Sequence, residues 1–213
     1  MSEEIPAARF TGTEGVGDWR VLVTRGACAY FRTGSFSAGV ALVAAIGRLV
    51  DGSVAPEVDL RAEGVFVRLA DSEVELARGI SAAARELGAE AVPAAVQDVN
   101  LTITTTDPAR VRPFWRAVLG YEEVGDEDLA DARGQAPSVW FQSTEDAGAA
   151  GTRLHVDVFV PHDEAEARVA AALAAGGRLV RDEYAPAWWT LADPDGNEAD
   201  IATWQGREDD AGE

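Results

Sequence analysis

The chain has 213 residues, 47% of them hydrophobic, and a formal net charge of −19. This length is enough for one large or two small globular domains, whereas the charge argues against binding to nucleic acid or to anionic membrane surfaces. All eighteen basic residues are Arg, which excludes Schiff-base chemistry and phosphate loops that depend on Lys.

The cysteine content and the start of the chain bear on location. Cys28 is the single cysteine, so no internal disulfide forms, as is typical of a reducing compartment. The N-terminus has no signal-peptide pattern, and no apolar stretch reaches the length of a membrane span. We therefore predict a cytoplasmic protein with no membrane partner.

In the first half, two predicted hairpins are each followed by an amphipathic helix, giving the order ββαββα. Arg25-Gly26 and Glu63-Gly64 are the turns, and Ser35 is placed to cap the first helix. The predicted strands cover 19–24, 27–32, 57–61 and 65–69, and the second helix begins near 71–72.

This order, with Asp18-Trp19, Phe31, Phe36 and the segment 55–60 before a Val-x-Val-x-Leu strand, resembles pterin-4a-carbinolamine dehydratase over residues 9–88. The resemblance implies a His-His-Pro triplet before the third strand and a further His after the fourth. Here Val54-Ala55-Pro56 replaces the triplet, and no His precedes residue 155. We expect residues 1–91 to form a dehydratase-like domain without its catalytic histidines, with Glu57, Asp59 and Asp71 as the remaining acids near the old site.

After a linker near 89–95, the second half repeats a strand-then-helix unit. Strand 99–103 leads through Asp107-Pro108 into a helix that ends at Leu119-Gly120, and strand 154–158 leads into a helix from about Asp163 to Gly176-Gly177. A turn, Asp193-Pro194-Asp195-Gly196-Asn197, then sets up the last strand. Such duplication predicts two copies of one structural module.

The Asp-Pro entry with Phe114-Trp115, the Leu-Gly-Tyr exit, the segment 153–157 and the Asp-Pro-Asp-Gly-Asn turn together resemble the vicinal oxygen chelate superfamily of glyoxalases, bleomycin-resistance proteins and dioxygenases. The resemblance covers residues 96–205 and implies two βαβββ modules curled around a concave cavity. The predicted fold class is thus α+β: a ββαββα domain, a paired βαβββ glyoxalase-like domain and an acidic tail at 206–213.

Alternation along the predicted strands decides which side chains share a face. In each strand the apolar residues fall on one side, beneath the helices, and polar or aromatic residues fall on the other. The second face collects Asn100, Gln142, His155 and Asp200 from four strands. By resemblance, these strands carry the metal ligands of the family.

Two readings of this tetrad stay open. In one, Asn100, Gln142, His155 and Asp200 hold a divalent ion (Zn, Mn, Ni or Fe) weakly, because carboxamides are poorer ligands than imidazole or carboxylate. In the other, His155 and Asp200, with Arg153 or Asp157, line a metal-free cavity. His162 is interpreted as a surface or capping residue.

Aromatic residues join the same face, which suits a planar or apolar small molecule. The predicted ligand-binding residues are Trp140, Phe159, Trp188, Arg153 and Asp157. The leading hypothesis is a protein that binds a small aromatic or vicinal-oxygen ligand, with metal-dependent lyase or isomerase chemistry. The alternatives are a non-catalytic sequestering or sensor protein, and residual 4a-hydroxytetrahydrobiopterin dehydratase activity. Exposed sheet edges further predict a homodimer or an intramolecular pairing of the modules.

Overall fold

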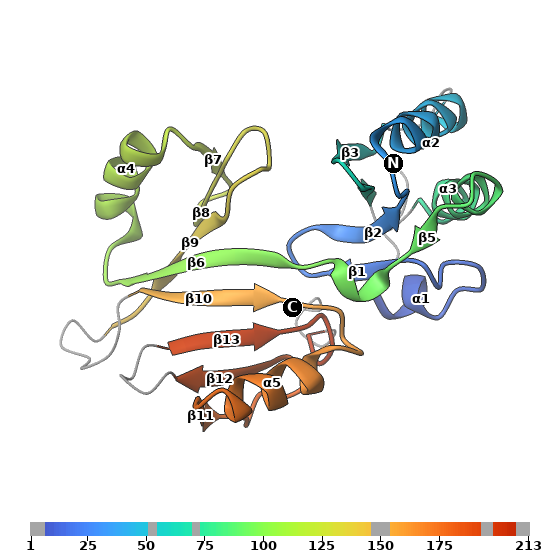
Figure 1. Cartoon of the computed structure of the whole chain (residues 1–213). Coiled ribbons are helices and arrows are strands. Elements are labelled where there is room, and N and C mark those ends of the chain that lie inside the picture. The colour runs from blue at the N-terminus through green and yellow to red at the C-terminus, as the bar shows by residue number, and fades with distance from the viewer. Residues whose placement is uncertain (1–6, 51–54, 70–72, 146–153, 193–197, 208–213) are drawn as a thin grey trace. The chain divides into compact units, whose positions relative to one another are not determined.

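The computed structural model describes residues 7–50, 55–69, 73–145, 154–192 and 198–207 (Figure 1). It contains two compact units. The first consists of the chain up to Gln97, the segment Val160–Glu164 and the residues from Thr203 onward, and the second consists of Asp98–Phe159 and Ala165–Ala202. The chain therefore passes four times from one unit to the other. The domain limits at 91, 96 and 205 stay a prediction from the sequence.

The first unit is an antiparallel sheet in the order β1-β2-β4-β3, with β5 also paired to β2. Helices α2 and α3 share its core (Figure 1), and the predicted order ββαββα is present after a short N-terminal helix. The elements are α1 (Ala7–Thr11), β1 (Arg20–Leu22), β2 (Gly26–Arg32), α2 (Phe36–Leu49), β3 (Glu57–Leu60), β4 (Gly64–Leu69), α3 (Val74–Glu86), β5 (Glu90–Ala91) and the 3-10 turn η1 (Pro93–Ala95).

Two contacts explain how the helices are held in this unit. The indole of Trp19 lies in the core and donates from Nε1 to the carbonyl of Ala77 at 3.2 Å and to Oγ of Ser81 at 3.0 Å, which ties α3 to the start of the sheet. On α2, a side chain at Gly39 would collide with Leu60, since an added Cβ would lie 2.4 Å from its Cδ1. The glycine therefore permits the close approach of α2 to β3.

Segments from the second half of the sequence complete the first unit. The Asp163 carboxylate accepts hydrogen bonds from Nε and Nη2 of Arg20, with a shortest distance of 2.6 Å. The Trp204 side chain packs against the core of this unit and donates from Nε1 to Nδ1 of His162 at 3.3 Å. His162 is thus a half-buried hydrogen-bond acceptor, not the surface or capping residue that the sequence suggested.

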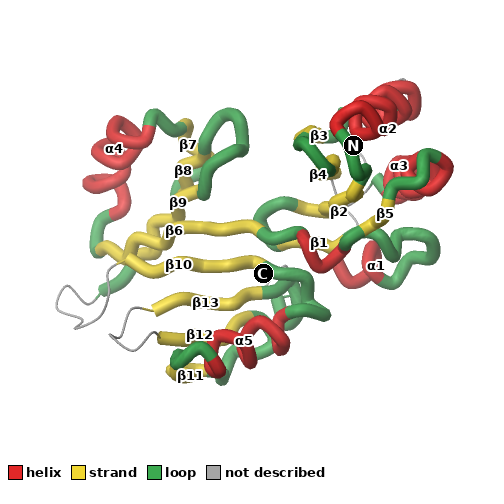
Figure 2. Tube along the Cα trace, viewed as in Figure 1, coloured by secondary structure: helices red, strands yellow, loops and turns green. Residues whose placement is uncertain are grey.

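The second unit contains the two predicted βαβββ repeats in one eight-stranded sheet, in the order β11-β12-β13-β10-β6-β9-β8-β7 (Figure 2). The first repeat comprises β6 (Asp98–Thr105), α4 (Pro108–Leu119), β7 (Glu122–Val124), β8 (Asp128–Ala130) and β9 (Ser138–Ser143). The second comprises β10 (Leu154–Phe159), α5 (Ala165–Ala174), β11 (Arg178–Arg181), β12 (Trp188–Ala192) and β13 (Glu198–Ala202).

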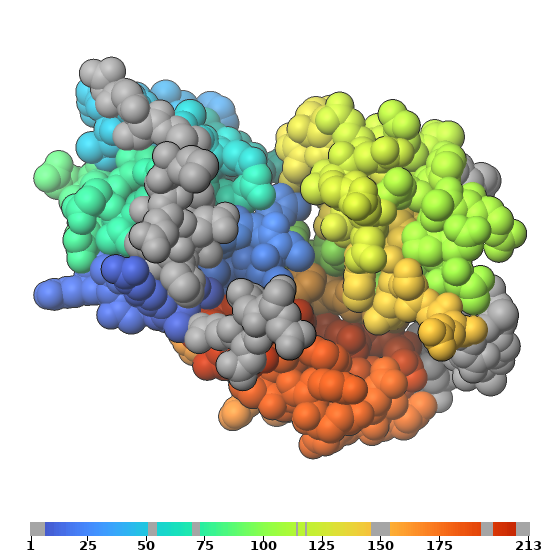
Figure 3. All heavy atoms as spheres, turned by 180° about the vertical axis from the view of Figure 1, so that it is seen from behind, coloured from blue at the N-terminus to red at the C-terminus, as the bar shows by residue number. Residues whose placement is uncertain are grey.

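The first strands of the repeats, β6 and β10, pair antiparallel at the centre of the sheet, and each pairs in parallel with the last strand of its own repeat. Figure 3 shows the two repeats from behind, the first in green to yellow and the second in orange to red. None of the helices in the described ranges combines the length and apolar character that a membrane crossing requires.

Local sequence accounts for the helix of the first repeat. Asp107 caps α4 by accepting a hydrogen bond from the Arg110 amide at 3.0 Å, and Gly120 ends it with a positive φ of 68°, which glycine adopts without strain. Apolar side chains of the sheet pack beneath α4, as alternation predicted. This cluster consists of Leu129, Val139 and Phe141, with Leu101, Ile103, Val111, Trp115 and Tyr121 packed against it.

Candidate functional site

The central strands carry a polar row on the sheet face opposite the α4 cluster. Strand pairing aligns Ser138 with Asn100, Asn100 with Asp157, Asp157 with Asp200, and Asp200 with Thr190. Residues paired across neighbouring strands point to the same side of a sheet. Five strands therefore place polar side chains in one line: Ser138, Asn100, Asp157, Asp200 and Thr190.

Three of the five polar side chains in this row are buried. Asn100, Asp157 and Thr190 expose 7%, 8% and 1% of their surface. Within the part of the chain that the structure describes, three buried side-chain oxygens lack a hydrogen-bond partner: Asn100 Oδ1, Asp157 Oδ1 and Thr190 Oγ1. All three belong to the row. Because buried polar atoms are nearly always satisfied, a group of unsatisfied ones indicates a place where a ligand or ion completes the bonding.

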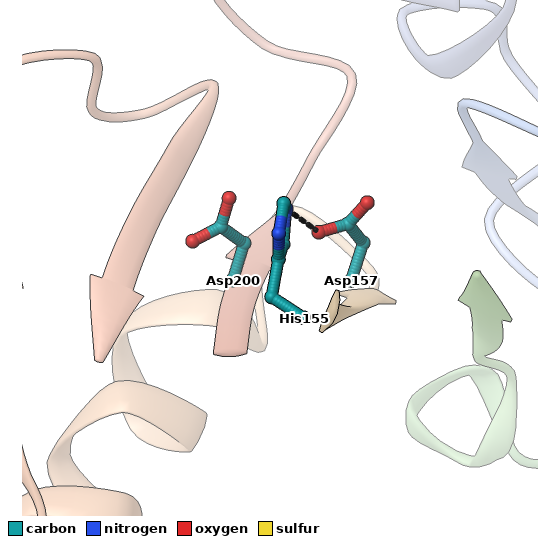
Figure 4. A group of neighbouring side chains, drawn as sticks. All are labelled: His155, Asp157 and Asp200. Atoms are coloured by element: carbon teal, nitrogen blue, oxygen red, sulfur yellow. Dashed lines mark ion pairs between the residues drawn. The ribbon is translucent and has the colours of Figure 1, made fainter. Parts of the chain in front are cut away.

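His155 lies beside this row, between the two carboxylates (Figure 4). Its Nε2 atom is 3.3 Å from Oδ1 of Asp157. One ligand atom each from His155, Asp157 and Asp200 can be chosen so that all three lie within 4.8 Å of one another. The cluster therefore combines one imidazole and two carboxylates on two parallel neighbours, β10 and β13.

Interactions with neighbours and burial shift the pKa values of His155 and Asp200. Asp157 interacts with the imidazole and raises the pKa of His155, against the opposing effect of burial. Burial raises the pKa of Asp200, whereas the neighbouring Thr190 hydroxyl lowers it. That hydroxyl forms no hydrogen bond of good geometry, so we regard burial as the dominant effect on Asp200.

Thr102 supports the cluster from the neighbouring strand. It is fully buried on β6, directly opposite His155 in the strand pairing. Its hydroxyl donates to Oδ2 of Asp157 at 2.5 Å. The hydroxyl therefore fixes the orientation of this carboxylate and leaves Oδ1 to face His155.

The remaining residues of the predicted tetrad occupy different positions. Asn100 lies in the polar row beside Asp157. Gln142 lies further along β9, where it pairs with Thr104 and accepts a hydrogen bond from that hydroxyl at 3.3 Å. Trp140, which pairs with Thr102, separates Gln142 from Ser138, the residue that pairs with Asn100. Of the predicted metal ligands, His155 and Asp200 lie close together, whereas Gln142 is hydrogen-bonded to Thr104. The predicted metal set therefore stays a proposal.

The predicted ligand-binding residues spread over the same face. The Trp140 indole donates to Oε2 of Glu127 at 3.3 Å, and Trp188 stacks on Tyr184 with ring centroids 4.3 Å apart. Phe159 is buried and pairs with Ala202, which in turn pairs with Trp188. Asp157 joins His155 and Asp200. Arg153 lies outside the described residues.

Three residues of this site were not among the predicted metal ligands. The sequence predicts ligand binding for Asp157 and no role for Thr102 or Thr190. Alternation places Asp157 and Thr102 on the correct face, but alternation cannot show which residues of different strands stand opposite one another. The sequence signal that was available is the polar alternation Asn100-x-Thr102 and His155-x-Asp157 in otherwise apolar strands.

The donor set fits a divalent metal ion. Bonds of about 2.0 to 2.2 Å from a metal to nitrogen and oxygen ligands separate the ligand atoms by at most about 4.4 Å. The three atoms of the cluster lie within 4.8 Å of one another, so small side-chain rotations bring them to this range. Imidazole suits Zn, Fe and Ni, and carboxylate suits Mn, so the mixed set agrees with the metals expected from the sequence.

The acids proposed for residual dehydratase chemistry lie in the first unit. Glu57 forms an ion pair with Arg68, and Asp59 accepts hydrogen bonds from Arg61. Asp71 lies outside the described residues. Both described carboxylates are therefore paired with an Arg side chain, which is a common arrangement on strand surfaces.

Comparisons with known proteins agree with the second unit. Residues 100–202 match the family model of the glyoxalase-like domain. No curated protein sequence matches the chain. The resemblance of residues 9–88 to dehydratases finds no support in these comparisons and stays a prediction.

Among solved structures, the chain is similar to a glyoxalase/bleomycin resistance protein/dioxygenase superfamily member from Vibrio splendidus 12B01 (18% identity, 51% of this chain and 99% of that one, TM-score 0.33). It is also similar to an NAD-dependent benzaldehyde dehydrogenase from Legionella pneumophila (11%, 49% and 97%, TM-score 0.37). A superfamily enzyme from Burkholderia phytofirmans PsJN matches at 20% identity (48% and 94%, TM-score 0.19). By its family match, the segment 100–202 corresponds to a glyoxalase-like domain.

Proposed function

We propose that the second unit binds one divalent metal ion and, beside it, a small molecule that offers adjacent oxygen atoms. The observation that carries this proposal is the grouping of every unsatisfied buried side-chain oxygen, among the described residues, in the row that contains Asp157 and Asp200. Leaving such atoms without hydrogen bonds costs about 1 to 3 kcal/mol each, of which the nearby His155 imidazole offsets a part at Asp157 Oδ1. A bound cation and its ligand would remove this cost.

His155, Asp157 and Asp200 would hold the ion, and Thr102 would keep the Asp157 carboxylate in place. When bound, a metal of this kind acts as a Lewis acid that polarises a coordinated oxygen. Asn100 and Thr190 stand at opposite ends of the Asp157–Asp200 pair in the row, where amide and hydroxyl groups can hydrogen-bond to the ligand. Trp140 and Trp188 offer aromatic surface on the same face. This arrangement supports lyase or isomerase chemistry next to a polarised oxygen.

The test is the metal content of the full chain, purified untagged and without chelator, followed by titration of the metal-free protein with Mn²⁺, Fe²⁺, Ni²⁺ and Zn²⁺. We expect close to one equivalent of one of these ions in the wild type. His155→Ala, Asp157→Asn and Asp200→Ala should each lower the affinity at least about 100-fold, since even outer-sphere changes cost 10- to 100-fold.

Glu122→Gln is the matched control, because Glu122 is an exposed acid on β7 of the same sheet. It removes one negative charge without touching the cluster and should leave the metal content unchanged. A wild-type protein that is folded by circular dichroism yet binds none of the four ions would sink the metal proposal.

Oxalate, a small ligand with adjacent oxygen donors, then tests the second part of the proposal. We expect it to bind the metal-loaded wild type and not the metal-free protein or the Asp200→Ala variant. Equal oxalate affinity with and without metal would show that the ligand does not use the ion.

The second candidate is a metal-free protein that sequesters or senses an organic cation. The specific observation in its favour is the same set of unsatisfied acceptors, which an ammonium group could also satisfy, together with the aromatic residues Trp140 and Trp188. Metal-free protein that binds benzylammonium, whose N–H groups can donate to these oxygens, with affinity lost in Asp157→Asn, would favour this candidate over the metal site.

A further inference from the structure

The polar row of the second unit continues beyond Thr190 onto the edge strand β11. Strand pairing places Arg181 directly opposite Thr190, whose other neighbour in the row is Asp200. Residues paired in this way point to the same side of the sheet. The face that carries the proposed metal site therefore ends in an arginine on the outer strand of the second repeat.

A β-bulge in β11 brings a second arginine to this face. Arg178 and Arg181 are three positions apart, so in a regular strand their side chains would point to opposite sides. The pairing register shifts before Arg181, so that Arg178 lies opposite Ala192 and Arg181 lies opposite Thr190. Ala192 and Thr190 are two positions apart on β12 and share a face. The bulge therefore places both arginines on the side of the site, as bulges beside functional sites commonly do.

The Arg181 side chain extends from the edge strand towards the cluster. Its Nη2 atom lies 3.8 Å from Oε2 of Glu198, which is on β13, two positions before Asp200. Because β12 lies between β11 and β13, the guanidinium reaches across one strand. Burial raises the pKa of Asp200, and the positive charge of Arg181 is among the effects that oppose it. A ligand held at this carboxylate is therefore within the range of the Arg181 charge.

Both arginines are exposed, and Glu198 does not occupy the N–H donors of Arg181. A separation of 3.8 Å is too long for a hydrogen bond. The Arg181 side chain is 52% exposed, and Arg178 is exposed as well. A guanidinium presents planar N–H donors that match the oxygens of an anionic group. Two guanidinium charges and one carboxylate charge leave a net charge of +1, which balances one carboxylate better than the nearly two negative charges of a phosphate.

The other end of the same face is acidic. Trp140 lies on the site face of β9 and pairs with Asp128 of β8, and its indole donates to Oε2 of Glu127 at 3.3 Å. Among the residues just named, no cation accompanies these two carboxylates. An anionic group is repelled at this end and attracted at β11. The charges therefore set the direction in which an anionic ligand lies on the sheet.

We propose that the small molecule bound in the second unit carries a second anionic group, a carboxylate, which Arg181 holds with the help of Arg178. This inference rests on the proposed function, because the adjacent oxygen atoms of the ligand bind the ion and the remainder of the molecule reaches β11. The ligand then extends from the cluster across Thr190, whose buried Oγ1 lacks a hydrogen-bond partner among the described residues. The substrate class is thus a dicarboxylate with an oxygen substituent next to one of its carboxylates.

Isothermal titration of the metal-loaded full chain with 2-oxoglutarate and with 2-oxovalerate tests this arrangement. Both probes have the same carbon chain and the same adjacent oxygen donors, but 2-oxoglutarate alone carries a second carboxylate. We expect 2-oxoglutarate to bind the wild type at least about 10-fold more tightly, which is the preference that one charge-assisted hydrogen bond provides. Arg181→Gln should abolish this preference. Arg181→Lys should keep part of it, because the charge remains without the planar fork, and Arg178→Gln should reduce it less than Arg181→Gln does.

Arg116→Gln is the matched control, because Arg116 of α4 is likewise an exposed arginine, 3.4 Å from its partner Glu123. It removes the same charge far from the arginines of β11 and should leave the preference unchanged. Oxalate, whose oxygens all lie at the chelating end, reports the metal site separately. Metal-dependent oxalate binding with equal affinity for the two 2-oxo acids, or an Arg181→Gln variant with the full preference, would overturn this inference and leave the metal site standing. A metal-treated wild type that binds none of the three compounds would overturn both proposals.

Discussion

The two βαβββ repeats of the second unit share a topology and differ in what their strands carry. In the first repeat, β8 and β9 supply Leu129, Val139 and Phe141 to a packed cluster under α4. In the second, β10 and β13 supply His155, Asp157 and Asp200 to a charged cluster on the opposite face. The corresponding strands of the first repeat, β6 and β9, offer the amides Asn100 and Gln142 instead.

This difference shows how one scaffold can serve two purposes. Period-two alternation separates the face that packs from the face that binds, so substitutions on one face leave the other intact. In the proposed metal site, one repeat therefore supplies the imidazole and both carboxylates. The other repeat contributes hydrogen-bonding side chains, above all Thr102 and Asn100, from the strand that joins the two halves.

The largest effect on stability is expected from a cavity in the packing face, which tests whether the two faces are independent. Phe141 is fully buried beneath α4, so Phe141→Ala should lower the free energy of unfolding by about 3 to 5 kcal/mol. The metal affinity of the protein that remains folded should stay unchanged. Urea denaturation followed by circular dichroism measures the first, and metal titration measures the second.

Leu179→Ala provides the comparison, because Leu179 is 42% exposed on β11 and its truncation should change stability by no more than about 0.5 kcal/mol. If Phe141→Ala weakened metal binding as much as Asp157→Asn does, the two faces would not be independent.

A smaller effect is expected from the side chain that links the two repeats. Thr102→Val keeps the shape of the residue and removes the hydroxyl that donates to Asp157. We expect metal affinity to fall about 10- to 100-fold, with Thr102→Ser restoring most of it. Isothermal titration with the preferred ion measures this change.

Thr104→Val is the matched control two residues further along β6, where the hydroxyl donates to Gln142 at 3.3 Å. This variant should bind metal like the wild type. Equal losses in both variants would place Gln142 in the metal site and revive the tetrad predicted from the sequence.

The sequence was sufficient for the repeats and for the face on which the site lies. Alternating apolar residues in 98–104 and 153–160 correctly separated Leu101 and Ile103 from Asn100 and His155. The sequence did not predict the strand pairing, because the alignment of Asp157 with both Asn100 and Asp200 depends on the register of three strands. For this reason the sequence places Asp157 beside His155 and Asp200 only in the metal-free reading and does not predict it as a metal ligand.

Long-range contacts were equally inaccessible to the sequence. Arg20 and Asp163 are 143 residues apart in the chain yet form three hydrogen bonds, and Trp204 packs on a core built from the first hundred residues. Local patterns carry no signal for such pairs. The segments that hold His162 and Trp204 therefore fell within the predicted glyoxalase-like domain.

The smallest expected effect is a difference in pKa between the two histidines. His155 belongs to the cluster, and His162 belongs to the first unit. Asp157 raises the pKa of His155, whereas burial lowers the pKa of His162. In metal-free protein, the two imidazole signals should therefore titrate on opposite sides of about 6.5, the ordinary value. Proton NMR resolves them, since the chain has two histidines, and His162→Gln assigns the signals.

The stability contributions of these histidines have opposite signs. A raised pKa means that the folded state binds the proton more tightly, so the stabilisation from His155 is complete below about 6.5 and is lost as pH rises through its folded value. A lowered pKa means that the His162 contribution to stability increases with pH between its folded pKa and about 6.5.

Asp157→Asn should move the His155 midpoint downward and leave the His162 midpoint in place. Because protons and metal compete for the imidazole, metal affinity should rise with pH over the range in which the metal-free protein loses stability from His155. A His155 midpoint that did not respond to Asp157→Asn would mean that the two side chains do not interact in solution.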